Sequence, residues 1–197
     1  SRPDCVAMTF LDAQLIATSL TYAELMDEVD RLAHGLASKN LDPSCPLGIL
    51  ISSQRGQVLH YLAALRCGLT PAILTPPTAK QSEKYYLETL ERVVDNCQFS
   101  AIVTDIGAAV EGTPIFGAFS WTTIREALPA LGGPIEDAAF LQFSSGTTGI
   151  KKGVSISHRA ALAQIDTYAK AIGLNDDDVI VSWLPLYHDM GFITALN

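Results

Sequence analysis

The sequence predicts an α/β fold, a mostly parallel sheet layered with helices. The first observation is that short apolar runs alternate with longer segments whose apolar residues recur every three or four positions. The second observation is that the connections between these segments are short. Strand–helix–strand units with short connections form right-handed crossovers, which place the strands in parallel and the helices on the faces of the sheet.

Four segments are predicted to be helices because their apolar residues fall on one face at helical spacing. The first opens with Thr21, followed three residues later by Glu24, which is a capping-box arrangement. Gly68 follows the second segment, where a left-handed residue can end a helix. The predicted helices cover residues 20–40, 56–67, 80–98 and 157–173.

The strands are predicted from short apolar runs. The run at 46–52 contains no charged residue, as is typical of a strand that is buried on both faces of a parallel sheet. Two prolines end the next run. The region 106–137 is rich in Gly, Pro and Ala and holds one short helical candidate, "WTTIREAL". The predicted strands cover residues 46–52, 70–77, 100–105, 138–145 and 178–185.

Composition limits the classes of function. The 197 residues are 48% hydrophobic and 17% charged, which suits one domain or a large part of one. A net charge of −8 argues against nucleic acid as a partner. The four cysteines form no C-x-x-C pair, as in reduced cytosolic proteins, and no apolar run approaches the roughly 18 residues of a membrane helix. The start lacks the plan of a secretory signal, so a soluble, cytoplasmic protein is predicted.

The stretch "FSSGTTGIKKG" (143–153) is flexible and locally cationic, and it directly follows a predicted strand. Ligands of open α/β sheets bind beyond the carboxyl ends of the strands. Glycines allow close approach of the backbone to a bulky anion, and backbone N–H groups, hydroxyls and lysine can contact phosphate oxygens. It is not a Walker A loop, and a surface turn with solvated lysines is the alternative. The candidate binding residues are Ser144, Ser145, Gly146, Thr147, Thr148, Gly149 and Lys152. Gly153 adds backbone freedom, and Lys151 adds local positive charge.

Two motifs carry a family resemblance. "FLQFSSGTTGIKKGVSISHRA" resembles the glycine-rich signature of the adenylate-forming superfamily, roughly [ST]-[ST]-G-[ST]-T-G-x-P-K-G-V. Lys151 stands where that family usually has proline, so Lys152 aligns with the family's lysine. "SWLPLYHDMGFI" (182–193) resembles the next motif in the form typical of fatty acyl-AMP ligases. The segment "SLTYAELMDEVDRLAHGL" is similar to the family's usual first helix, so the resemblance spans most of the chain.

The resemblance implies a ligase that joins a carboxylate to the α-phosphate of ATP, forms acyl-AMP and releases pyrophosphate. ATP and Mg²⁺ are the implied cofactors, and CoA or an acyl carrier protein is the implied acceptor. The approach of two anions requires positive charge and oriented donors. Thr147, Thr148 and Lys152 are implied to contact the departing phosphates, and the glycines fit a loop that moves.

His188 has two interpretations. It follows "LPLY" at the end of a predicted strand and precedes Asp189. In the structural interpretation, Asp189 favours the start of a helix and His188 packs beside it. The resemblance implies instead that His188 lies beside the carboxylate and the α-phosphate, where an imidazole can donate to an oxygen. Trp183 and Tyr187 either line a nearby pocket or belong to the core.

The remaining histidines are interpreted as structural. His158 follows Ser157, which suits an N-cap, and His34 and His60 lie inside predicted helices. No His or Cys pair has metal-ligand spacing, so no metal-binding residue is predicted.

Residues 1–197 are expected to be an incomplete amino-terminal large domain of an acyl-adenylating enzyme. The family's adenine-binding segment, its acidic Mg²⁺ ligand and its small carboxy-terminal domain are expected further along a longer chain. A fatty acyl-AMP ligase is favoured over an acyl-CoA synthetase because of the His-Asp-Met-Gly form. A third possibility is a non-catalytic α/β fragment that acts as a binding module.

Overall fold

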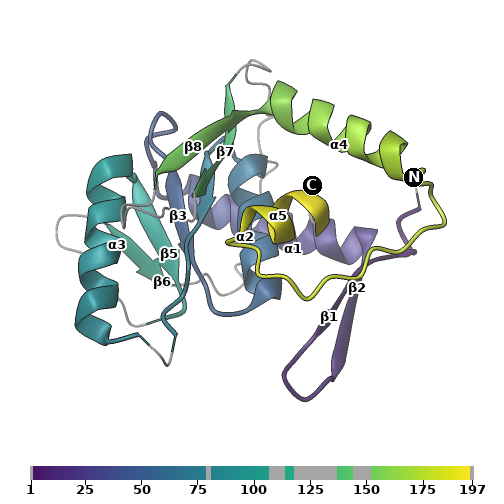
Figure 1. Ribbon diagram of the computed structural model, residues 1–197, viewed down its shortest axis with the longest axis horizontal. Helices are drawn as coiled ribbons and strands as arrows, with labels where there is room; N and C mark the ends of the chain where they lie inside the picture. Colours follow the sequence, from purple (N-terminus) through teal and green to yellow (C-terminus); the bar gives the residue numbers. More distant parts are fainter. Residues whose placement is uncertain (1, 79–80, 107–113, 118–136, 144–151, 196–197) are drawn as a thin grey trace.

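The computed structural model describes residues 2–78, 81–106, 114–117, 137–143 and 152–195. A six-stranded sheet lies between helices, so the predicted α/β fold is confirmed (Figure 1). The strand order is β6-β5-β3-β4-β7-β8. These strands are β3 (Leu47–Leu50), β4 (Pro71–Ile73), β5 (Ala101–Thr104), β6 (Ile115–Gly117), β7 (Ala138–Phe143) and β8 (Gly153–Ser157).

The sheet is mostly parallel, as predicted, with one antiparallel edge strand. β3 pairs in parallel with β4 and β5, and β4 pairs in parallel with β7. β8 runs antiparallel to β7, with Phe143 opposite Gly153. β8 was not among the predicted strands, and it lies between the glycine-rich loop and the helix predicted at 157–173. Its residues Gly-Val-Ser-Ile-Ser have the alternation of a strand, and β7 offers them an edge to pair with.

Four helices match the predicted segments closely. Thr21 and Glu24 form the predicted capping box, and Gly68 has the predicted left-handed backbone, with φ of 76°. Salt bridges from Arg55 to Glu28 and from Arg66 to Asp30 join α1 and α2. The helices are α1 (Tyr22–Ala37), α2 (Gln54–Arg66), α3 (Glu83–Cys97), α4 (His158–Ile172) and the short α5 (Asp189–Ala195). The helical candidate at 121–128 lies outside the described residues.

Helices cover both faces of the sheet, and side chains that alternate along a strand pack against the helices of opposite faces. On β3, Ile49 packs with α1, α2 and α5, whereas Leu50 packs with α3. On β7, Phe140 belongs to the first face and Phe143 to the second. Figure 1 shows α3 on one side of the sheet and α1, α2 and α5 on the other. β3 is thus buried on both faces, as the apolar run at 46–52 predicted.

A β-hairpin in the amino-terminal part, and the side-chain hydrogen bonds that shape its turn, were not predicted. β1 (Val6–Leu11) and β2 (Ala17–Thr21) form a separate antiparallel hairpin. The Asp12 carboxylate shapes its turn by accepting hydrogen bonds from two backbone N–H groups, those of Gln14 and Ile16. An Asp side chain can mimic a backbone turn in this way.

The region after β8 is unusually exposed. α4 buries none of its residues, although Leu162, Ile165 and Ile172 form an apolar stripe along one side. The strand predicted at 178–185 is not formed, because these residues pair with none of the described strands. Val179, Val181 and Trp183 are each at least 80% exposed. β-Branched residues favour a strand only where a neighbouring strand completes the hydrogen-bonded ladder.

Candidate functional site

The two ends of the glycine-rich loop lie side by side. β7 ends at Phe143 and β8 begins at Gly153, and these two residues are register partners in the antiparallel pair. Lys152 directly precedes β8. The other binding candidates lie outside the described residues, as does Lys151, and the expected contacts of these candidates with phosphate stay predictions. They are Ser144, Ser145, Gly146, Thr147, Thr148 and Gly149.

Gly153 is a glycine because of packing. A Cβ atom there would lie 2.8 Å from Leu141 Cδ2 and 3.2 Å from Cys97 Sγ. Contacts this short require a neighbouring side chain to move, so the packing of Leu141 and Cys97 favours a residue without a side chain at this position. Its backbone φ is not among the positive values. Gly153 therefore does not serve as a residue of left-handed backbone.

His188 lies in a tight turn that leads into α5. Its N–H donates to the Pro185 carbonyl (3.1 Å), and its own carbonyl accepts from Phe192 N–H (2.9 Å) as the first hydrogen bond of the helix. Gly191 allows this turn, because a Cβ there would lie 2.3 Å from Pro185 O. The His188 side chain is exposed. It is therefore not buried in the helix start, although its ring lies against that of Tyr187 at a centroid distance of 5.2 Å. The contact of His188 with a ligand stays a prediction.

An aromatic cluster holds α5 against the sheet. Phe192 is 2% exposed and contacts Tyr61 of α2 and Phe140 of β7 edge-on, at centroid distances of 4.9 and 4.8 Å. Tyr187 is partly buried against the same core, whereas Trp183 is 85% exposed. Edge-to-face pairs of this kind stabilise beyond the apolar area that they bury.

Two glutamine side chains connect the His188 turn to the rest of the fold. Gln142 Nε2 donates to Tyr187 O (3.3 Å), and Gln54 Nε2 donates to Leu184 O (3.1 Å). Both contacts join residues far apart in the sequence. Sequence reasoning missed them because only the folded topology brings these segments together.

A second polar contact lies at the carboxyl ends of neighbouring strands. Asp105, directly after β5, accepts from Ser52 N–H (2.8 Å) and from the Ser52 hydroxyl (2.6 Å) after β3. These residues were not among the sequence candidates. Ser52 and Asp105 thus link the carboxyl ends of the neighbouring strands β3 and β5.

His60 is buried beneath this edge. Its Nδ1 must donate to the Gly56 carbonyl (2.8 Å), because a carbonyl oxygen only accepts. Its Nε2 has no hydrogen-bond partner among the described residues. Burial lowers the pKa of His60, opposed by the Gly56 hydrogen bond and the charge of Asp105. The prediction that His60 is a packing residue is consistent with this environment.

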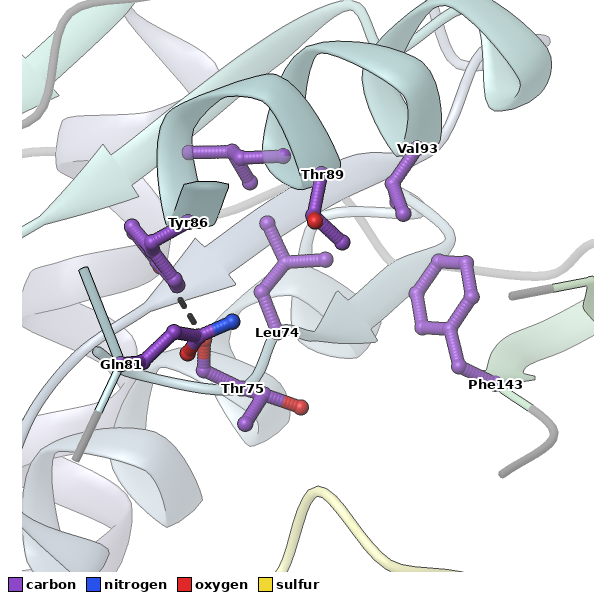
Figure 2. A pocket seen from close by; sticks show the side chains of 8 residues that line it. Leu74, Thr75, Gln81, Tyr86, Thr89, Val93 and Phe143 are labelled. Atoms are coloured by element: carbon purple, nitrogen blue, oxygen red, sulfur yellow. Dashed lines mark hydrogen bonds between the residues drawn. The ribbon is translucent and has the colours of Figure 1, made fainter. Parts of the chain in front are cut away.

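A small cavity of about 70 Å³ lies between α3 and the ends of β4 and β7 (Figure 2). Leu74, Leu90, Val93 and Phe143 make its walls largely apolar. The Tyr86 hydroxyl donates to Thr75 O (3.0 Å) at its rim, and burial raises the pKa of Tyr86 to about 12. Phe143, after which the glycine-rich loop begins, is one of its lining residues.

The described residues contain neither a group of three metal-ligating side chains nor a helix long and apolar enough to cross a membrane. All four cysteines, which lie in the described part of the chain, are free thiols, as predicted.

The chain belongs to the family of AMP-binding enzymes, whose profile matches residues 1–197. The predicted resemblance to adenylate-forming enzymes is therefore confirmed.

Three similar proteins illustrate the relationship. The long-chain-fatty-acid–AMP ligase FadD32 of Mycolicibacterium smegmatis is 30% identical, over 99% of this chain and 33% of the relative. The 4-hydroxybenzoate–CoA/benzoate–CoA ligase of Rhodopseudomonas palustris is 27% identical, over 96% of this chain and 37% of the relative.

The third is a solved structure from a study of the fatty acyl-adenylate ligases of E. coli and L. pneumophila. It has a TM-score of 0.82 and 28% identity, over 96% of this chain and 36% of the solved chain. The present chain thus spans about a third of the length of these relatives.

Proposed function

We propose that the chain is the amino-terminal part of an ATP-dependent ligase that activates a fatty acid as acyl-AMP, releases pyrophosphate and passes the acyl group to a carrier thiol. The observation that carries the proposal is the attachment of the His188 turn to β7, the strand from which the glycine-rich loop begins. Membership of the AMP-binding family supports the nucleotide as ATP. The FadD32 relative supports a fatty acid as the substrate.

The proposed roles follow from the chemistry of the residues. Lys152, with the hydroxyls and N–H groups of residues 144–149, binds the departing β- and γ-phosphates and lowers the repulsion between the two anions. His188 donates to an oxygen of the carboxylate or of the α-phosphate. We expect Mg²⁺ to accompany ATP, but the described residues do not form a site for it.

The proposed setting is cytoplasmic lipid metabolism, and residues 1–197 are proposed to be one part of a larger amino-terminal domain. Relatives about three times as long support this division. CoA as the acceptor is the second candidate, which the benzoate–CoA ligase relative favours.

The test is fatty-acid-dependent exchange of pyrophosphate into ATP by the intact enzyme, with acyl-AMP identified by mass spectrometry. Acyl transfer to CoA is then compared with transfer to a carrier protein. The 197-residue chain alone is expected to show no exchange above background. It would lack the adenine-binding segment, the acidic Mg²⁺ ligand and the small carboxy-terminal domain that are expected further along the longer chain. Robust exchange by this chain would show that the catalytic groups are misplaced here, and absence of exchange by the intact enzyme would contradict the function.

A further inference from the structure

We infer that Gln142 is a positioning residue for His188, and that it fixes the histidine relative to β7 and to the start of β8, which follows Lys152. The catalytic part of this inference rests on the proposed function. Gln142 is not among the residues that the family motifs pointed to, and it acts through the backbone of its neighbour.

The first support is the place of Gln142 on β7. Phe140 and Gln142 are two residues apart on a strand, so both face the layer that contains α2 and α5. Phe140 holds α5 through its contact with Phe192, and Gln142 reaches the turn that precedes α5. The same strand face therefore supports α5 at two points, one apolar and one polar.

The second support is the chemistry of the contact. A main-chain carbonyl only accepts, so the Tyr187 oxygen requires a donor such as the Gln142 amide. The bonded peptide unit is the one that links Tyr187 to His188. Because a peptide unit is planar, fixing its carbonyl restricts the orientation of the following residue. Gln54 supports the other end of the turn by its bond to Leu184.

The third support is the position of Gln142 between the two predicted catalytic groups. In the β7–β8 pair, Gln142 lies opposite Val154, which is two residues from Lys152. The backbone of Gln142 therefore pairs with β8, the strand that follows Lys152. Its side chain binds the turn that carries His188. In the proposed reaction, Lys152 contacts the departing phosphates and His188 contacts the attacked α-phosphate or the carboxylate. The distance and orientation between these two side chains must therefore be kept constant.

The first experiment uses the 197-residue chain and does not depend on activity. The ring C–H signals of His188 are recorded by NMR in Gln142→Met, which keeps the side-chain length and removes the donor. Gln98→Met is the matched control, because Gln98 Nε2 also donates to a main-chain carbonyl, that of Asp95, at 3.3 Å. We expect Gln142→Met to shift or broaden the His188 signals and Gln98→Met to leave them unchanged. Unchanged signals in both variants would overturn the inference.

A second variant guards against misfolding of β7. Gln54 is exposed and lies at the start of α2, so Gln54→Met removes the other support of the turn without altering the sheet. A smaller change of the same His188 signals is expected. If Gln142→Met does not fold and Gln54→Met leaves the signals unchanged, the inference fails.

The final experiment uses the intact enzyme. Gln142→Met should lower kcat for acyl-AMP formation about 3- to 10-fold, the scale of one lost hydrogen bond, with KM for ATP nearly unchanged. In a His188→Ala background the same substitution should have no further effect, because the group that it positions is gone. Multiplicative effects would overturn the inference. If the unsubstituted enzyme forms no acyl-AMP, the proposed function fails, and the NMR signals still decide whether Gln142 positions His188.

Discussion

Phe192 of α5 and Tyr61 of α2 meet edge-on, with their ring centroids 4.9 Å apart and their planes at 88°. This contact secures the helix that follows the His188 turn to the core of the sheet. The turn at residues 185–188 leads directly into α5 and is bonded to it, so the position of the turn depends on the position of α5.

Truncation of this anchor should destabilise the fold. Phe192→Ala removes a 2%-exposed ring and leaves a cavity between two aromatic partners, so the free energy of unfolding should fall by about 3–5 kcal/mol. Urea unfolding measures the loss. Met190→Ala in the same helix is the control, since Met190 is 62% exposed and its loss should change stability by at most about 0.5 kcal/mol. Equal effects would show that α5 is not anchored by Phe192.

The two adjacent lysines should differ in their contribution to catalysis. Lys152→Ala in the intact enzyme should slow adenylation about 10- to 1000-fold, the scale for one oriented donor at a reacting phosphate. Lys151→Ala should cost far less, because the related motif has proline there. Exchange of pyrophosphate into ATP measures both. A reversed order would show that the alignment of Lys152 is wrong.

The exposure of His188 predicts a separation of rate and stability. His188→Ala should depress acyl-AMP formation while leaving the melting temperature nearly unchanged, because an exposed side chain contributes little to folding. Thermal unfolding and product formation at saturating ATP are measured on the same preparation. Early melting with normal turnover would remove His188 from the site.

Burial of His60 predicts a loss of stability in acid. Its pKa is lower in the folded protein than its ordinary value of 6.5, so below that pH the unfolded chain binds the proton more readily. Stability should fall as the pH drops from 6.5 toward the folded pKa and should then stop responding to this group. The difference in unfolding free energy between pH 7.5 and pH 5.5 should shrink in His60→Asn, measured against the unsubstituted chain. An unchanged difference would mean that His60 is not the responsible group.

The sequence was informative where structure depends on neighbouring residues. The capping box at Thr21 and Glu24 is local, and β3 is recognisable because both faces of the sheet bury it. β8 was missed because its five residues merge with the glycine-rich motif. The prediction of a strand at 178–185 was wrong, because a strand also needs a neighbouring strand to pair with, and its own sequence does not reveal whether one is present. Contacts such as Gln142 to Tyr187 span 45 positions and emerge only from the topology.

The bare flank formed by α4 and residues 179–183 has a practical consequence for solution behaviour. Four large apolar side chains of this flank, those of Leu162, Ile172, Val181 and Trp183, are more than half exposed. The isolated 197-residue chain should therefore bind the fluorescent dye ANS while still folded, and ammonium sulfate should precipitate it at unusually low concentrations. Introducing aspartate at Leu162 and Ile172 should reduce both responses and leave the melting temperature nearly unchanged, whereas Leu36→Asp in the buried core should abolish folding.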